Sequence, residues 1–291
     1  MEGEYHFAWL SLVVAAGIGF VLGLMIHSFI VVVNVMDWLK GRPVPSSERV
    51  IASIGISRFV FQSACLFDMF FAIFLNNNYI QFCLNIMKVM SNYSSIWLTT
   101  LLSVIFCTKI TNFQNAFFLK LKTIVSQKDV HFVAGSVALS IFYGVLHALL
   151  NCTAVLTNTT QASSVAGTSN VQIKLKHFIY FLLGNIVPFL IYFTSSFMVI
   201  FFLCFHMIKI KTCSTSSISL DNYYTALKSM LCCVLCYAFH VGSNLIAFYF
   251  IDSLSDVWIN VILNIFPALH SVILIYKTPK LKTRFLRLLL H

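Results

Sequence analysis

The chain has 291 residues, of which 59% are hydrophobic and only 10% are charged, and its mean hydropathy is +0.89. A soluble globular domain carries about 25% charged residues, so this composition excludes water as the solvent for most of the surface. The formal net charge of +10 could indicate a nucleic-acid partner, and the distribution of the basic residues decides whether it does.

Seven long apolar runs follow one another along the chain, each reaching the roughly 20 residues that cross a bilayer core. They cover 7–36, 50–75, 80–108, 131–152, 178–208, 229–251 and 257–276. Buried helices of a soluble core are the alternative, but seven such runs exceed what one core uses. We predict an all-α membrane protein, a seven-transmembrane helix bundle in a single domain over 1–291, because helices satisfy their own backbone in lipid.

The first run is not expected to be a cleaved signal peptide. The stretch that precedes it, MEGEYHFAW, has two acids and no Lys or Arg, and the apolar run is too long for such a peptide. An odd number of spans places the two termini on opposite sides of the membrane.

The connecting segments differ in charge from one side to the other. One side collects fifteen basic residues, which are Lys40, Arg42, Arg49, Lys109, Lys120, Lys122, Lys128, Lys209, Lys211, Lys228, Lys277, Lys280, Lys282, Arg284 and Arg287. The opposite side has Lys174 and Lys176 with four acids. The positive-inside rule therefore predicts a multi-pass membrane protein with its N-terminus outside and its C-terminus in the cytosol. The basic excess marks the inner membrane face, and no nucleic-acid partner is expected.

Polar residues in the second and third spans are the first candidates for a site. Asn85, Lys88, Asn92, Ser95 and Thr99 follow one another at steps of 3, 4, 3 and 4, which is one stripe on an apolar helix. This stripe fits either a ligand site or hydrogen bonds between helices. Lys88 and Asp68 are the charges deepest in the outer half, so Lys88 either reaches a ligand or pairs with Asp68.

Two sequons lie near the connection 153–177, which the charges place outside. They begin at Asn151 and Asn158, and both are predicted glycosylation sites. The connection is rich in Ser and Thr and is predicted to be a flexible loop. Cys83 and Cys152 both lie near the outer face, and a disulfide between them stays open.

The later spans contribute further amides and histidines. Asn185 is the amide of the fifth span at the outer level, His240 and Asn244 share a face of the sixth, and Asn260 and Asn264 share a face of the seventh. The predicted ligand-binding set is therefore Asp68, Lys88, Asn92, Asn185, His240, Asn244, Asn260 and Asn264.

A second polar group lies deeper, in the inner half of the bundle. His270 and Ser271 in the seventh span need partners in lipid, and Arg58 of the second span is expected at their centre because a charged side chain in a span faces protein or water. We predict an inner polar cluster of Arg58, His270 and Ser271, acting either as a switch or as inter-helix contact alone.

The chain ends in a basic amphipathic segment, 279–291. Pro279 is predicted to end the seventh span, and Leu281, Phe285, Leu288 and Leu289 then alternate with basic residues at helical spacing. This pattern predicts a short cytosolic helix on the anionic inner leaflet, so that membrane lipids are a partner.

No enzymatic constellation is visible. The nine cysteines lack metal-ligand spacing, and the histidines and acids form no HExxH motif or carboxylate pair. We expect no catalytic residue, no metal and no cofactor.

Four stretches resemble the type 2 (bitter) taste receptor family. They are FIVVVNVMDWLK (29–40), ISR (56–58), IWLTTLLSVIFCTKITNF with FFLKLK (96–113 and 117–122), and PALHSVILIYKTPKLK (267–282). The chain departs from that family at His27-Ser28, Tyr223, His240 and Lys277-Thr278. These departures concern the ligand range and the switch.

The resemblance implies a G-protein-coupled chemoreceptor that binds small bitter compounds in the outer half and activates a gustducin-like heterotrimeric G protein. In that family the positions of Lys88 and Asn92 belong to the ligand pocket. The residues expected to face the G protein are Lys109, Lys120, Lys122, His206, Lys209 and Lys228. A type 1 vomeronasal-like chemoreceptor is the related alternative. A small multi-pass transporter is the alternative from another class, although the internal repeats and interrupted helices of transporters are not visible.

Overall fold

The computed structural model describes residues 2–75, 77–111, 116–160, 175–176, 178–213, 221–249 and 256–290. Within this part every regular element is helical, and the elements are α1 (Glu2–Leu39), α2 (Ser46–Phe74), α3 (Asn78–Ile110), α4 (Ala116–Gln127), α5 (Asp129–Thr160), η1 (Leu182–Ile186), α7 (Val187–Cys213), α8 (Asp221–Tyr249), α9 (Asp256–Lys277) and α10 (Pro279–Leu289). Six of these helices, counting η1 and α7 as one, are long and apolar enough to cross a membrane, and α9 contributes a shorter apolar segment, Leu263–Lys277. The predicted seven-helix bundle is confirmed.

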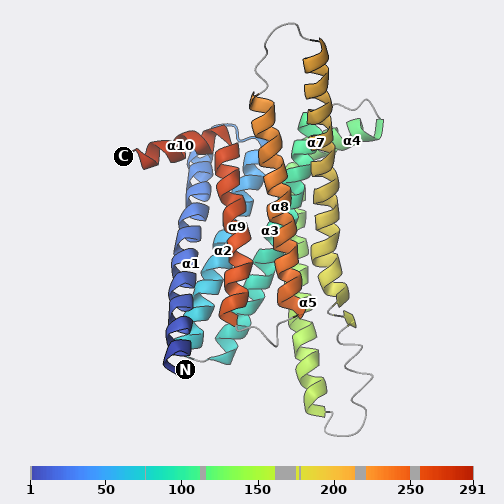
Figure 1. The fold of residues 1–291 in the computed structure, drawn as a ribbon. Coiled ribbons are helices and arrows are strands. Elements are labelled where there is room, and N and C mark those ends of the chain that lie inside the picture. Colours follow the sequence, from blue (N-terminus) through green and yellow to red (C-terminus); the bar gives the residue numbers. More distant parts are fainter. Residues whose placement is uncertain are drawn as a thin grey trace.

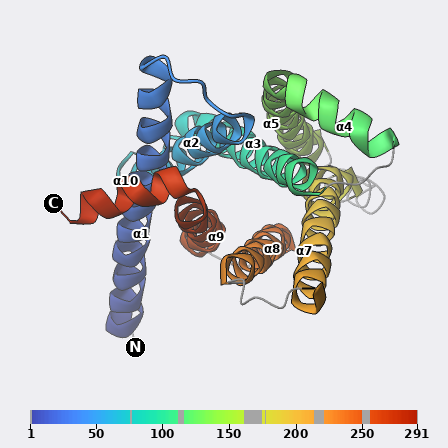
Figure 2. The same cartoon turned by 90° about the horizontal axis from the view of Figure 1, so that it is seen from above.

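The helices run side by side, with the two chain ends at opposite ends of the bundle (Figure 1). We call the end that carries α10 the tail end and the opposite one the N-terminal end. Seen from above, α3 passes through the middle of the molecule (Figure 2), where it contacts α2, α5 and α7. A residue on α3 can therefore reach several helices, which is why its polar stripe matters.

Local sequence signals account for several helix ends. Asn77 accepts hydrogen bonds from the backbone N–H groups of Tyr79 and Ile80 and so caps the start of α3. Gly41, with φ of 67°, follows α1 in the left-handed conformation that glycine tolerates. Pro279 is the first residue of α10, the position where the missing N–H costs nothing.

The fifth span contains a π-helix, η1, one turn after its start. Pro188 lies two residues after η1 and has no N–H to donate to the carbonyl of Gly184, so a regular turn would be interrupted there. A π turn widens the helix at this point, as such turns commonly do near functional sites. The predicted fifth span, 178–208, is confirmed as one apolar helical segment, Phe178–Thr212, and Leu182–Ile186 is a π turn within it.

Two further corrections concern connecting segments. The inner connection 109–130 contains the helix α4, whose position is shown in Figure 2. The connection 153–177, predicted as a flexible loop, is helical as far as Thr160 because α5 continues past the apolar run. Residues 161–174 lie outside the described part of the chain.

The largest core cluster joins α1, α2, α3 and α9 at the tail-end half. Ile54, Leu98 and Ile275 are almost fully buried there, and Leu281 of α10 packs into the same cluster. By contrast, Phe197, Phe201 and Phe205 are between 57% and 63% exposed on α7. A water-soluble protein seldom exposes such a row of large apolar side chains, and a lipid-facing surface explains it.

Candidate ligand and signalling sites

Arg58 is the centre of a buried polar cluster in the middle of the bundle. Its side chain comes from α2 and is 5% exposed. Nη1 donates to Ser271 Oγ at 2.7 Å and to the Pro267 carbonyl at 3.0 Å, and it lies 3.2 Å from His270 Nδ1. The structure therefore brings together Arg58, His270 and Ser271, the three residues predicted for the inner polar cluster, and joins α2 to α9.

The same guanidinium also contacts α3. Nε donates to Ser95 Oγ at 3.0 Å, and Nη2 donates to Thr99 Oγ1 at 3.3 Å. Ser95 and Thr99 are the deep end of the predicted polar stripe, and both are buried. One side chain thus links three helices, so a movement of any one of them must rearrange hydrogen bonds in the other two. Whether the cluster switches remains a prediction.

Lys88 and Asp68 form an ion pair between α3 and α2. Lys88 Nζ lies 2.7 Å from Asp68 Oδ2, and the side chains are 16% and 17% exposed. The pairing that the sequence left open is present. It leaves the ligand role of Lys88 untested, because a ligand carboxylate could compete for the same ammonium group.

Asn92, Asn244 and His240 form a chain of contacts from α3 to α8. Asn92 Nδ2 donates to Asn244 Oδ1 at 3.4 Å. Asn244 Nδ2 donates to the His240 carbonyl at 2.9 Å and lies 3.4 Å from His240 Nε2. Three residues of the predicted ligand-binding set therefore lie together between two helices.

Asn185 lies apart from that chain, inside η1. It is 2% exposed, and its Nδ2 donates to the Tyr93 hydroxyl at 3.3 Å. Its Oδ1 is buried and has no hydrogen-bond partner within the described part of the chain. The predicted amide of the fifth span thus offers one free acceptor.

The seventh span contributes less that can be described. Asn264 is 7% exposed on α9. Asn260 lies in the same helix, but its side chain is outside the described part.

Sequence reasoning missed a group of tyrosines beside Asn185. Tyr93 stacks on Tyr143 with ring centroids 4.7 Å apart, and Tyr180 meets both rings edge-on. Gly184 allows this arrangement, because a Cβ added there would lie 2.3 Å from Tyr93 Cε1. The signal in the sequence was Gly184 one turn before Pro188, and it did not reveal the tyrosines that pack against it.

The sequence also predicted two glycosylation sites and left a cysteine pair open near the outer face. Asn151 lies in α5 and its Nδ2 is 3.0 Å from His147 Nε2, so the amide that would carry a sugar is engaged within the bundle. Asn158 lies in the last turns of α5, with its side chain outside the described part. Cys83 and Cys152 are both free thiols on exposed positions, so the disulfide that the sequence left open is not formed.

An open cavity of about 480 Å³ lies at the tail end. Its walls come from α2, α3, α7, α8 and the turn into α10, and they include Glu48, Phe106, Tyr223 and Lys277. Polar groups line little of it, so the floor is mainly apolar with one acid and one base near the rim.

The six residues predicted to face a G protein lie on the helices α3, α4, α7 and α8. Lys109, Lys120, Lys209 and Lys228 are exposed on the tail-end portions of their helices, while Lys122 and His206 are half-buried. His206 lies against Phe202 and Tyr223, with ring centroids 6.2 and 5.6 Å away. Among the described residues that line the cavity, none of the six occurs.

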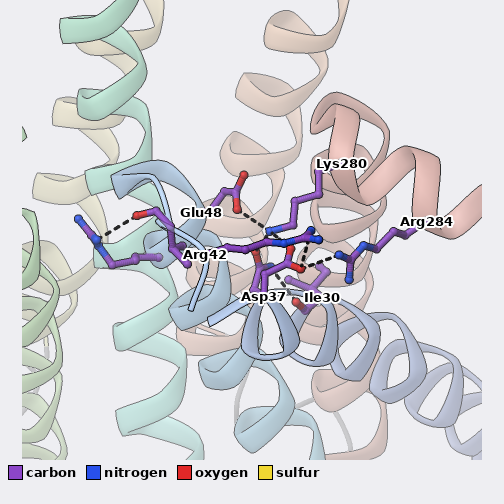
Figure 3. Close-up of polar contacts among 9 residues, drawn as sticks. Ile30, Asp37, Arg42, Glu48, Lys280 and Arg284 are labelled. Carbon is purple, nitrogen blue, oxygen red and sulfur yellow. Dashed lines mark hydrogen bonds and ion pairs between the residues drawn. The ribbon is translucent and has the colours of Figure 1, made fainter. Parts of the chain in front are cut away.

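The tail helix α10 is held to the bundle by a second cluster that the sequence did not reveal (Figure 3). Asp37 at the end of α1 lies 2.7 Å from Lys280 Nζ and 2.6 Å from Arg284 Nη2, and its side chain is 5% exposed. Lys280 also reaches Glu48 of α2 at 2.5 Å, and Arg42 lies 3.6 Å from Asp37. Burial disfavours the charged Lys280, but its hydrogen bonds to Asp37 and Glu48 outweigh this and raise the pKa of its ammonium group.

Comparison with known proteins agrees with this architecture. The sequence model of the taste receptor protein (TAS2R) family matches residues 1–291. The chain belongs to the TAS2R family. It is thus a G-protein-coupled receptor of the bitter-taste class, and such receptors in general take small-molecule ligands and couple to G proteins.

Individual TAS2R relatives are distant but match along most of their length. The chain is 28% identical over 290 residues to taste receptor type 2 member 4 of Pongo pygmaeus, which covers 94% of this chain and 95% of the relative. It is 27% identical over 290 residues to the member 4 protein of Homo sapiens, with the same coverage. It is 28% identical over 284 residues to putative taste receptor type 2 member 33 of Homo sapiens, covering 92% and 89%.

Proposed function

We propose that this TAS2R protein binds small bitter compounds in the N-terminal half of its bundle and activates a gustducin-like heterotrimeric G protein at the tail end. The observation that carries the proposal is that a group of polar side chains and an open cavity lie on opposite sides of the Arg58 cluster. Polar side chains gather between α3, η1 and α8 on one side of the Arg58 cluster, and an open cavity lies on the other.

The proposed ligand site is built from Asn92, Asn244 and Asn185. Two of them exchange a hydrogen bond of 3.4 Å, which a ligand can replace at little cost, and the third has a buried acceptor without a partner. Tyr93, which accepts from Asn185, belongs to a buried cluster with Tyr143, Tyr192 and Tyr237. A small, mostly apolar compound with one or two polar groups fits this chemistry. Lys88 at the rim extends the site to acidic compounds.

The proposed G-protein site is the tail-end cavity with the basic residues around it. Its apolar floor suits one face of an amphipathic helix, and the exposed lysines suit an acidic partner surface. This assignment requires the tail end to be cytosolic and the N-terminus external, the orientation that the distribution of basic residues favours.

The Arg58 cluster lies between the two sites and offers a route for coupling. A ligand that binds one arrangement of the helices more tightly shifts the population toward that arrangement. Because Arg58 links α2, α3 and α9, such a shift changes the wall of the tail-end cavity, to which all three helices or their ends contribute.

The test is a cell assay with a panel of bitter compounds and a co-expressed promiscuous Gα subunit. An active compound should raise intracellular calcium, and the signal should vanish when the Gα subunit is removed. Asn92→Leu should reduce its potency by about tenfold or more, the cost of one buried hydrogen bond. Thr194→Ala, on an exposed position of α7, is the matched control. Ligand flux in liposomes, with no Gα dependence in cells, would favour a transporter instead.

A further inference from the structure

The middle of the bundle contains a small space that Arg58 and His240 both line. α2, α3, α8 and α9 all contribute to its walls, which include Thr99, Cys236 and His270. The space accommodates about one group of the size of a water molecule. We call it the central cavity.

Arg58 brings a positive charge to this cavity without a negative partner. Its acceptors are hydroxyls, a backbone carbonyl and an imidazole, all of them neutral. Across the described residues no carboxylate forms an ion pair with Arg58, and none of the described residues that line the cavity is acidic. Arginine keeps its proton in proteins, and a buried charge without compensation is costly. The guanidinium therefore favours an anion nearby.

His240 brings a hydrogen-bond donor to the same cavity. The ring is 7% exposed, and the amide nitrogen of Asn244 lies 3.4 Å from Nε2. A neutral ring that accepts from this amide at Nε2 carries its proton on Nδ1. Nδ1 is buried and has no partner in the described part of the chain. An N–H group held in this way needs an acceptor.

Lys277 adds positive potential from the tail side. It lines a neighbouring cavity that shares Thr99 and His270 with the central one. Its ammonium group lies 5.0 Å from the centroid of the Phe106 ring, a contact that does not neutralise its charge. Of the described residues that line the two cavities, none is Asp or Glu.

We propose that the central cavity binds a small inorganic anion, with chloride as the biological ligand. The anion accepts hydrogen bonds from Arg58 Nη2 and His240 Nδ1 and supplies the negative charge that the cluster lacks. A cation is repelled by Arg58, and a polyatomic anion such as gluconate exceeds the available space. Chloride is only slightly larger than water, so a small displacement of the cavity wall admits it.

The test uses the purified full-length receptor, without agonist or G protein. Its thermal unfolding midpoint is measured in potassium chloride, bromide and gluconate at equal ionic strength. Chloride and bromide should raise the midpoint in a saturable way, because a ligand of the folded state stabilises it by mass action. Gluconate should not. Since no agonist is present, the result is independent of the proposed taste-receptor activity.

Four variants locate the effect. His240→Phe removes the donor and should raise the half-saturating chloride concentration by about tenfold. His240→Asn keeps a nitrogen donor near Nδ1 and should stay within about threefold of the wild type. His27→Phe is the matched control, because His27 is a buried histidine with an unpartnered Nδ1 that does not line the central cavity. Cys236→Met fills the cavity from its wall and should abolish the chloride effect even where His240→Phe does not fold.

Two outcomes overturn the proposal. Equal stability of the wild type in chloride and gluconate means that the cavity holds water. A chloride effect that is the same in the wild type and in Cys236→Met belongs to the basic surface of the tail end.

Discussion

The ion pair between Lys88 and Asp68 gives the sharpest prediction about ligand recognition. Lys88 Nζ lies 2.7 Å from Asp68 Oδ2 and both side chains are largely buried. Lys88→Ala leaves the carboxylate without its partner. Breaking a buried pair in this way costs about 3–5 kcal/mol, and we take the lower end, about 3 kcal/mol, because each side chain keeps some exposure. Surface expression should therefore fall.

The double variant Asp68→Asn with Lys88→Ala separates folding from recognition. It contains no stranded charge, so expression should return close to that of the wild type. If Lys88 also binds ligand, acidic agonists should remain weak by roughly tenfold to a hundredfold, the loss of one charge-assisted hydrogen bond. Neutral agonists should recover fully. Lys88→Met controls for the apolar stem, which can pack independently of the charge.

Concentration–response curves for acidic and neutral agonists, normalised to surface expression, provide the measurement. Full recovery of acidic-agonist potency in the double variant would refute a ligand role for Lys88. Normal expression of Lys88→Ala alone would refute the structural contribution of the pair.

Four further predictions follow from other contacts. His270→Ala removes an acceptor from Arg58 and should lower surface expression or alter basal signalling; normal expression, basal activity and ligand response together would show that His270 is dispensable. Asn158→Gln should remove a glycosidase-sensitive mobility shift while Asn151→Gln leaves it, because the Asn151 amide contacts His147; a shift that persists in the double variant contradicts the site. Asp37→Asn should weaken the attachment of α10, and amide hydrogen exchange over 279–289 should become roughly tenfold faster. Glu48→Gln should have a smaller effect, because Arg284 still pairs with Asp37. Unchanged exchange in Asp37→Asn would contradict the role of this cluster. Gly184→Ala should reduce expression because its Cβ would lie 2.3 Å from Tyr93 Cε1, and Tyr93→Ala should restore it; normal expression of Gly184→Ala would show that the ring moves freely.

Hydropathy located the spans well because a segment that crosses a bilayer must be apolar over about 20 consecutive residues. The helices extend beyond the apolar runs, as in α8, which begins at Asp221 rather than near residue 229. Backbone hydrogen bonding continues into water once a helix exists, so apolar length alone underestimates helix length. The helix α4 was missed because hydropathy detects only long apolar runs. Its 12 residues include two lysines and are too few to cross a membrane.

The buried polar contacts were predictable only in part. A charge in a span must find partners, so Arg58 and the His270–Ser271 pair were expected to meet. Ser95 and Thr99 were recognised as polar but not as partners of Arg58, because helix rotation decides which side a stripe faces. Asp37 gave no signal at all. Its partners Lys280 and Arg284 lie more than 240 residues later, and the tail helix was expected to contact lipid alone.

Four carboxylates form ion pairs toward the two ends of the bundle, while the Arg58 cluster in the middle has none within the described part of the chain. Asp37 and Glu48 bind the tail helix, Asp129 pairs with Arg49, and Asp68 pairs with Lys88. Each of these four acids thus has a basic partner other than Arg58, and each lies toward one end of the bundle. Arg58 is left in the middle with neutral acceptors. A helix rearrangement therefore changes the hydrogen bonds around Arg58, which has no carboxylate partner among the described residues. A small anion in the central cavity would be sensitive to that change, so agonist binding and anion binding should influence each other reciprocally.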